Sequence, residues 1–205
     1  RVGAPSGSAV ALTENLSVGG YGGYSYTETD YRGIDASVDT NAAHFGLFAR
    51  ARHQVSETGV IQATLDGAYS YFDNDAERNP YGYGKSSGSF DQNVYSAGLE
   101  LAYEWKAWEN GRVTPFVAGR VMWLDQDGFT ESGGLAPVNM KSMTAESYTT
   151  TLGARVEHDF VVSGGAVITP AFTAAWKHEY GDDRLDSRAG FTNTMAQTPL
   201  DFTVN

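Results

Sequence analysis

Histidine and acidic residues are the side chains in this 205-residue sequence that could do chemistry, and their spacing matches no known reaction centre. None of the four histidines belongs to an H-E-x-x-H or similar metal-binding pattern; they are His44, His53, His158 and His178. The chain has no cysteine, which excludes a disulfide framework, a thiolate metal site and a cysteine nucleophile. We therefore expect no catalytic residue, no bound cofactor and no metal, and we expect that the chain is not an enzyme.

Charge narrows the choice of partners. With 14 Lys and Arg against 25 Asp and Glu, the formal net charge is -11, so a polyanion such as nucleic acid would be repelled. No run approaches the ~18 consecutive apolar residues of a membrane-spanning helix. A membrane β-barrel is still allowed, because each of its strands needs only about 10 residues with alternate ones apolar.

Alternation with a period of two is the main pattern in the sequence. In 94–105 one face carries Tyr95, Ala97, Leu99, Leu101, Tyr103 and Trp105, and the other carries Ser96, Gly98, Glu100, Ala102 and Glu104. A strand separates these two sets completely, whereas a helix would mix them. Segments with the same property are predicted at 16–27, 43–52, 60–71, 113–124, 146–160 and 167–180, with a partial strand before Leu12 and the start of another at 200–204.

The connections between these strands alternate in length. Short turns are predicted at 12–15, 56–59, 109–112 and 162–165, and long polar loops at 28–41, 73–92, 125–145 and 181–199. A transmembrane barrel has this alternation because one rim carries tight turns and the other carries extended loops. The acidic runs in the long loops lack the spacing of a calcium-binding loop, so we interpret them as a solvated surface.

Four segments resemble the autotransporter β-domain, an outer-membrane translocator barrel. They are Thr114–Arg120, Asp125–Glu131, Thr151–Val156 with its LG-x-R pattern, and Trp176–Asp182 with its W-x-H-E-Y-G-D pattern. The resemblance is densest between Tyr95 and Asp182. It implies an all-β, antiparallel, up-and-down transmembrane barrel of twelve strands, with a helix threading the pore and an upstream passenger.

The chain departs from that pattern at both ends, where the pore helix, the passenger and a terminal strand ending in an aromatic residue are missing from the sequence. We therefore expect residues 1–205 to be a single translocator domain, an incomplete portion of the barrel that is truncated at both ends.

The polar faces of the predicted strands carry ten charged residues, which in a barrel would line the lumen. They are Arg50, Arg52, Asp66, Glu100, Glu104, Arg120, Arg155, Glu157, Lys177 and Glu179. A charge at the midplane of the lipid face costs about 2–4 kcal/mol. The confinement of these charges to one face therefore indicates that this face points away from lipid. Bracing and hydrating the interior is the role that we favour over specific transport contacts.

Aromatic residues gather near the ends of the same strands, where they would form interfacial girdles. The candidates are Tyr71, Tyr95, Trp105, Trp123, Trp176 and Tyr180.

The function implied by the resemblance is to anchor in the outer membrane and to bring an N-terminal passenger to the cell surface, as in type V secretion, with the long loops extracellular. The expected partners are outer-membrane lipid, the barrel-assembly machinery and the protein's own passenger. Two alternatives stay open: a smaller outer-membrane or soluble β-rich adhesin that binds through its acidic loops, and a barrel protease using His178 and neighbouring carboxylates.

Overall fold

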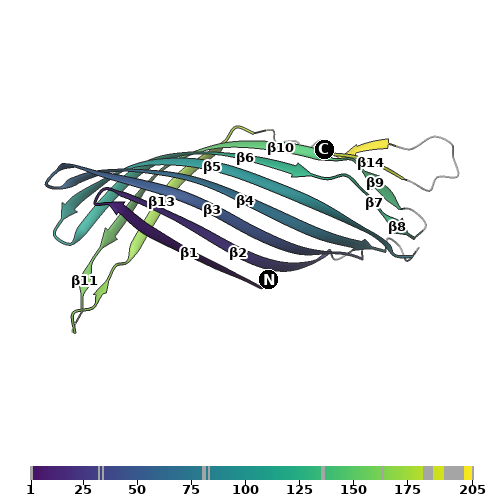
Figure 1. Ribbon diagram of the computed structural model, residues 1–205, viewed down its shortest axis with the longest axis horizontal. Helices are drawn as coiled ribbons and strands as arrows, with labels where there is room; N and C mark the ends of the chain where they lie inside the picture. Colours follow the sequence, from purple (N-terminus) through teal and green to yellow (C-terminus); the bar gives the residue numbers. More distant parts are fainter. Residues whose placement is uncertain are drawn as a thin grey trace.

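A single curved antiparallel sheet dominates the computed structural model (Figure 1). The structure describes residues 2–31, 33, 35–79, 82, 84–134, 137–162, 164–181, 187–191 and 201–204. The main sheet has the order β1-β2-β3-β4-β5-β6-β10-β13, so strands that follow one another in the chain lie side by side. This up-and-down arrangement confirms the predicted fold class.

Eight long strands form this wall. Their bounds are β1 Val2–Thr13, β2 Leu16–Tyr31, β3 Ala36–Ser56, β4 Gly59–Arg78, β5 Ser86–Trp108, β6 Gly111–Gln126, β10 Met143–His158 and β13 Ala171–Glu179. Seven correspond to the segments with strong or weaker alternation, and β1 is the strand predicted only in part. The four short turns lie where they were expected, between β1 and β2, β3 and β4, β5 and β6, and β10 and β13.

The prediction of long loops was wrong in extent, because much of their length is strand. The loop expected at 28–41 reduces to a turn between Tyr31 and Ala36, and the one at 73–92 to the segment between Arg78 and Ser86. Ladder hydrogen bonds join main-chain groups and need no apolar face, so a hairpin can continue with polar side chains on both sides. A strand of 20 residues, as in β4, measures about 66 Å, which far exceeds the ~25 Å apolar band of a barrel.

The predicted loop 125–145 also contains strand. It holds β7 Phe129–Thr130, β8 Ser132–Gly133 and β9 Val138–Met140. Phe129 pairs with Met140, three residues further along each strand than the pair Gln126 and Met143, so the β6–β10 hairpin continues in step as β7 and β9. The hairpin therefore extends the wall beyond the main sheet.

Further short strands complete the description. β11 Phe160–Val161 and β12 Val167–Ile168 prolong the β10–β13 hairpin at the short-turn end. At the other end, β14 Ser187–Phe191 pairs with β9, and β15 Asp201–Val204 pairs with β14. β15 coincides with the strand start predicted at 200–204.

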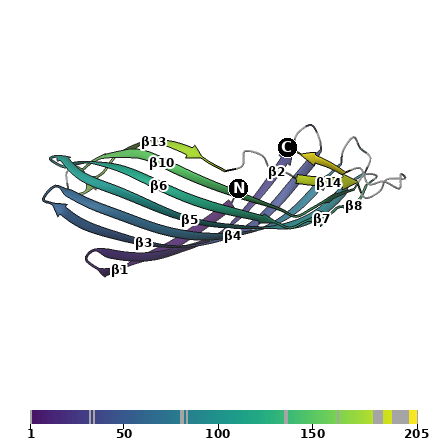
Figure 2. The same cartoon turned by 90° about the horizontal axis from the view of Figure 1, so that it is seen from above.

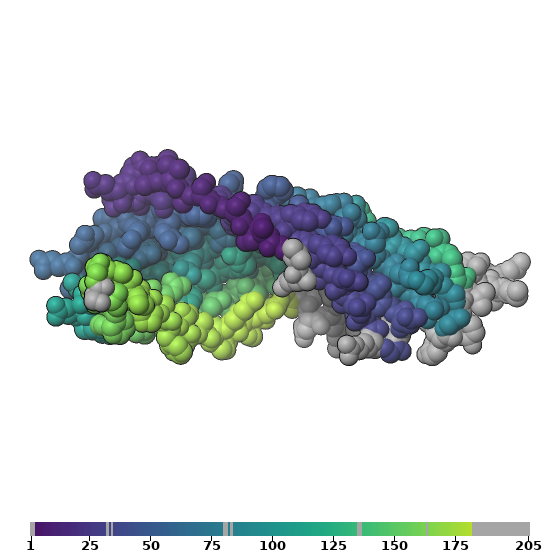
Figure 3. All heavy atoms as spheres, turned by 90° about the horizontal axis from the view of Figure 1, so that it is seen from below, coloured from purple at the N-terminus to yellow at the C-terminus, as the bar shows by residue number. Residues whose placement is uncertain are grey.

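The wall is a trough within the described residues, where β1 and β13 do not pair with each other. Figure 2 shows the strands curving together along their length, and Figure 3 shows β1 (purple) and β13 (yellow-green) as the two sides of a hollow with β3 to β5 on its floor. Among the residues that the structure describes, the buried hydrophobic side chains of the core are Ala42, Ala102 and Phe116, so this part of the chain has a very small apolar core. The sheet therefore exposes two large faces, one concave and one convex. The functional residues are sought on these two faces.

Candidate functional site

Sheet register assigns the predicted polar residues to one face. Residues directly opposite each other in a sheet project to the same side. One such rung runs across six strands from Arg50 through Thr64, Glu100, Ala118 and Thr151 to Lys177. A second runs through Phe48, Asp66, Gly98, Arg120, Thr149 and Glu179.

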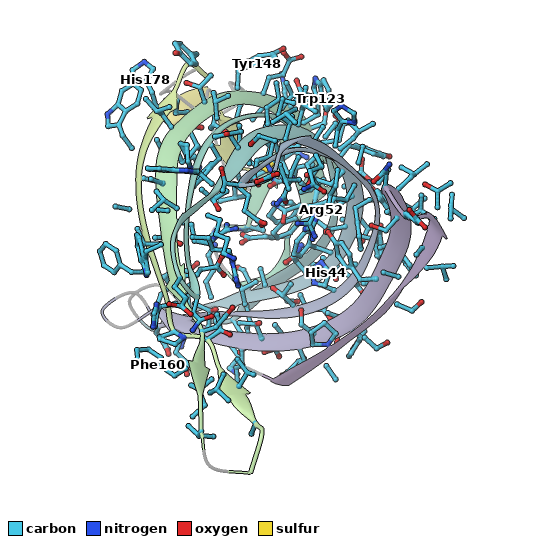
Figure 4. All side chains as sticks on the ribbon, turned by 90° about the vertical axis from the view of Figure 1, so that its left-hand side faces the viewer. His44, Arg52, Trp123, Tyr148, Phe160 and His178 are labelled. Atoms are coloured by element: carbon cyan, nitrogen blue, oxygen red, sulfur yellow. The ribbon has the colours of Figure 1, made fainter. Side chains whose placement is uncertain are left out.

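The four other polar candidates lie one to three steps from the first rung on the same face, so the register places all ten on one face. These four are Arg52, Glu104, Arg155 and Glu157. The face is the concave one: seen along the trough, Arg52 and His44 lie inside the curve of the ribbon, whereas Trp123, Tyr148 and His178 lie outside it (Figure 4).

The convex face is apolar. A rung across the same six strands consists of Ala51, Ala63, Leu101, Val117, Leu152 and Trp176. Large side chains on this face are open to the surroundings, with Leu47 73% and Leu152 61% exposed. A continuous exposed apolar surface of this size is typical of a protein that contacts membrane or another protein.

All six predicted interfacial aromatics project from the convex face. Tyr95 and Trp123 share a rung with Tyr69, and the rings of Tyr69 and Tyr95 lie 5.1 Å apart. The other four are Tyr71, Trp105, Trp176 and Tyr180.

Three further tyrosines, which were not singled out from the sequence, lie among these aromatic residues on the convex face at the long-hairpin end. We call them the tyrosine belt; they are Tyr24, Tyr69 and Tyr148. Tyr24 donates its hydroxyl to Asn41 (2.5 Å), and Tyr69 donates to Asn93 (2.7 Å). Tyr148 donates to Glu146 at 2.6 Å. An apolar ring on the wall with a hydroxyl bound to a polar group toward the rim is the arrangement expected at a boundary between apolar and aqueous surroundings. For Tyr148 the sequence holds a local signal, since Glu146 lies two residues earlier in the same strand. Asn41 and Asn93 lie on the next strand, two residues from the positions opposite Tyr24 and Tyr69, so the strand register was needed to find them.

A polar hollow of about 440 Å³ occupies the middle of the concave face. Its charged lining residues are Arg50, Asp66, Glu100, Arg120, Arg155 and Lys177, and threonines 64, 149 and 151 add hydroxyl groups. The charges come from β3, β4, β5, β6, β10 and β13, so the hollow exists only because these six strands form one curved wall.

Asp66 and Arg120 are joined across β5. Arg120 Nη2 donates to both carboxylate oxygens of Asp66, at 2.9 and 2.8 Å, and Nη1 donates to Ser96. Gly98 lies between the two residues, and a Cβ there would be 2.8 Å from Asp66 Oδ1 and 2.9 Å from Arg120 Nη2. The absence of a side chain at Gly98 therefore lets a pair two strands apart meet directly above the sheet.

Arg155 is supported by an aromatic ring. Its guanidinium carbon lies 5.8 Å from the centre of the Phe116 ring, within the range of a cation–π contact. Phe116 in turn lies over Gly153, where a Cβ would come within 2.6 Å of the ring. Phe116 is 9% exposed and Arg155 is half-buried, so the charge is held toward the hollow.

At the short-turn end the concave charges are paired. Arg52 binds Glu104 (3.3 Å), which also accepts a hydrogen bond from Gln62 (2.9 Å). Arg112 binds Glu157 (2.8 Å) and Asp159 (3.0 Å).

The sequence reasoning missed Arg112 because it placed this residue in a turn, whereas β6 already begins at Gly111. In the structure Arg112 lies directly opposite Glu157, a residue that the sequence did place on the polar face.

Toward the long-hairpin end the concave face carries amides and hydroxyls. Thr40, Asn74, Gln92 and Gln126 form a row of hydrogen bonds across β3 to β6. His44 lies nearby and bridges Ser25 (3.2 Å) and Ser70 (2.9 Å). We interpret these groups as cross-strand ties, because each satisfies its partner on the next strand.

Two arrangements that resemble reaction centres do not have the geometry for one. His178 stacks on Trp176 on the convex face while Glu179 projects from the concave face, so the protease alternative loses its adjacent pair; Asp182 and Asp183 lie outside the described residues. Ser86 has the G-x-S-x-G pattern at 84–88, yet it begins β5 and its buried hydroxyl donates to the carbonyl of Gly133.

Within the part of the chain that the structure describes, no helix has the length and apolar character needed to cross a membrane.

Comparison with known proteins agrees with the geometry. The family profile described as "Autotransporter beta-domain" matches residues 3–205. Among solved structures, the translocator domain of autotransporter NalP from Neisseria meningitidis is similar, with a TM-score of 0.69 and 19% identity. The match covers 92% of this chain and 67% of that chain. No curated protein matches. This chain belongs to the autotransporter β-domain family, and it is a type V secretion translocator of the bacterial outer membrane that is associated with a passenger segment.

Proposed function

We propose that the convex face contacts the lipid of the outer membrane and that the concave face lines the pore through which an N-terminal passenger reaches the cell surface. The observation that carries this proposal is the separation of the two faces. A rung such as Arg50 to Lys177 is largely polar, whereas the next rung toward the short turns, Ala51 to Trp176, is entirely apolar. Lipid accommodates the apolar rung at no cost and water accommodates the polar one.

The long hairpins are the extracellular rim in this proposal, and the short turns face the periplasm. The hairpin ends carry carboxylates on the convex side beyond the tyrosine belt, among them Asp39, Asp73, Asp75 and Asp91. Asp39 lies directly opposite Asp75, and Asp73 opposite Asp91. Paired carboxylates of this kind require water or counter-ions, so they belong outside the apolar layer.

The chain acts without catalysis in this proposal. Transport draws on folding and assembly of the barrel, which needs no cofactor, and the remaining partners are membrane lipid and the barrel-assembly machinery. The ten concave charges, with Arg112, hydrate and brace the lumen, and the convex aromatic residues set the depth of the wall in the membrane.

Single cysteines test the two faces, because the chain has none of its own. Thr151 and Leu152 are adjacent in β10 and project from opposite faces. In the full-length protein in outer membranes, a membrane-impermeant maleimide should label the Thr151→Cys variant and leave Leu152→Cys unlabelled. Equal labelling of both variants would sink the proposal in favour of a soluble binding module.

Orientation is tested separately with cysteines at the two rims. Ser87→Cys, in the β4–β5 hairpin, should be labelled on intact cells, and Glu57→Cys, in the β3–β4 turn, only after the outer membrane is permeabilised. The reverse pattern would invert the proposed orientation and leave the assignment of the faces intact.

A further inference from the structure

Charges on the concave face are not balanced evenly along the trough. At the short-turn end, Arg52 and Arg112 each bind a carboxylate, at 3.3 and 2.8 Å. In the central hollow the only ion pair among the described residues is that between Asp66 and Arg120. The hollow therefore holds charges that this pair does not neutralise.

Four charged residues of the hollow remain after that pair is set aside. Arg50 makes a long hydrogen bond to the neutral Thr64 (3.4 Å), and Arg155 contacts the Phe116 ring. Lys177 and Glu100 also line the hollow. Three cations against one carboxylate give this group a net charge of +2, within a chain whose formal net charge is -11.

The arrangement suits a carboxylate-bearing ligand. Arg50 on β3 and Lys177 on β13 lie at the two ends of one rung, and Arg155 lies two steps nearer the short turns on the same face, so the cations surround the hollow on the curved wall. Neighbouring threonines supply hydroxyl donors. Guanidinium and ammonium groups bind carboxylates through charge-assisted hydrogen bonds, and a partly enclosed polar site strengthens them.

We propose that this cationic hollow is a docking station for acidic side chains of the polypeptide that occupies the lumen. The inference rests on the proposed lumen-lining role of the concave face, and it adds the chemistry of the partner. A carboxylate of the threaded segment offsets the excess positive charge midway along the wall, so segments with Asp or Glu at this level dwell longer than neutral or basic ones.

The test measures block of ionic current through the full-length protein, with its passenger removed, in planar lipid bilayers. Deca-glutamate, deca-glutamine and deca-lysine serve as probes. Deca-glutamate should block most strongly, and its affinity should fall as salt rises. In the double variant Arg155→Gln/Lys177→Gln the affinity for deca-glutamate should be about tenfold weaker, which corresponds to about 1.4 kcal/mol.

Two further variants complete the design. Lys85→Gln/Lys141→Gln also removes two positive charges, but from the long-hairpin end, away from the hollow, and it should leave the block unchanged. Glu100→Gln raises the charge of the hollow by one and should strengthen the block, so the inference does not depend on a variant that weakens binding. Heat-dependent gel mobility confirms that each variant is folded.

The outcomes separate the inference from the proposed function. Equal block by deca-glutamate and deca-glutamine, or stronger block by deca-lysine, would overturn the docking station while leaving a conducting lumen. Insertion without any current, together with labelling of Leu152→Cys, would contradict the lumen assignment and the inference with it.

Discussion

Gly98 should prove to be coupled energetically to Asp66 although the two residues lie on different strands. A Cβ at position 98 would approach Asp66 Oδ1 to 2.8 Å and Arg120 Nη2 to 2.9 Å, which is closer than real Cβ contacts allow. Both atoms end flexible side chains, so they can move aside. The bidentate geometry of the Asp66–Arg120 pair would then be lost.

The expected magnitude follows from two opposing effects. The side chains of Arg120 and Asp66 are 47% and 26% exposed, and pairs of such exposure contribute about 0.2–1 kcal/mol, with bidentate geometry favouring the upper end. Replacing a strand glycine by alanine stabilises a chain by about 0.5–1 kcal/mol, because the unfolded state loses conformational freedom. Gly98→Ala alone should therefore change the free energy of unfolding by less than about 0.5 kcal/mol.

A double-mutant cycle separates the two effects, which nearly cancel in the single variant. In an Asp66→Ala background the pair is already absent, so Gly98→Ala should stabilise the protein by about 0.5–1 kcal/mol. The coupling energy between the two positions should be close to 1 kcal/mol. The free energies come from guanidinium unfolding of the full-length barrel in phospholipid vesicles, followed by tryptophan fluorescence.

Gly119 provides the matched control. It lies on the neighbouring strand β6, and a Cβ there meets nothing within 4 Å. Gly119→Ala should have the same effect with and without Asp66→Ala. A Gly98–Asp66 coupling below about 0.3 kcal/mol, the usual error of additivity, would refute the reasoning.

Two further predictions concern the ends of the wall. Glu131 is 8% exposed and binds Arg78 through both carboxylate oxygens. Glu131→Gln should therefore speed amide exchange in the β6–β10 hairpin beyond the main sheet by about 5–30-fold and leave exchange at the centre of β4 unchanged. Unaltered protection in that hairpin would contradict this prediction. At the base of the β11–β12 hairpin, the hydroxyl of Thr169 and then the guanidinium of Arg112 on β6 lower the pKa of Asp159. A lowered folded-state pKa stabilises the hairpin above the unfolded value of about 3.9, and this contribution disappears as the pH falls through the lower folded value. Hydrogen exchange of the hairpin between pH 6 and pH 2 measures this loss, and Thr169→Val should move it toward higher pH; an unshifted profile would speak against the hydroxyl as the cause.

Strand identity and facing were predictable from the sequence because a strand has a period of two. Arg155 and Val156 are neighbours in the chain, and alternation alone was enough to place them on opposite faces. The four short turns were also predictable locally, from short segments with turn-forming residues such as Asn110 and Gly111 between the alternating stretches. The ends of the long strands were not predictable, because main-chain ladders continue through polar residues such as Asp75 and Ser89 without any apolar signal.

Partners across the wall required the tertiary structure. Asp66 and Arg120 are 54 residues apart, and only the register of β4, β5 and β6 brings them to either side of Gly98. The sequence likewise offered no reason to separate Arg120, which has a carboxylate partner, from Arg50 and Lys177, which face the hollow. By itself the sequence determined which side of each strand is polar, since that depends on neighbours two residues apart. The fold decided which charges meet, because register and curvature are properties of the whole sheet.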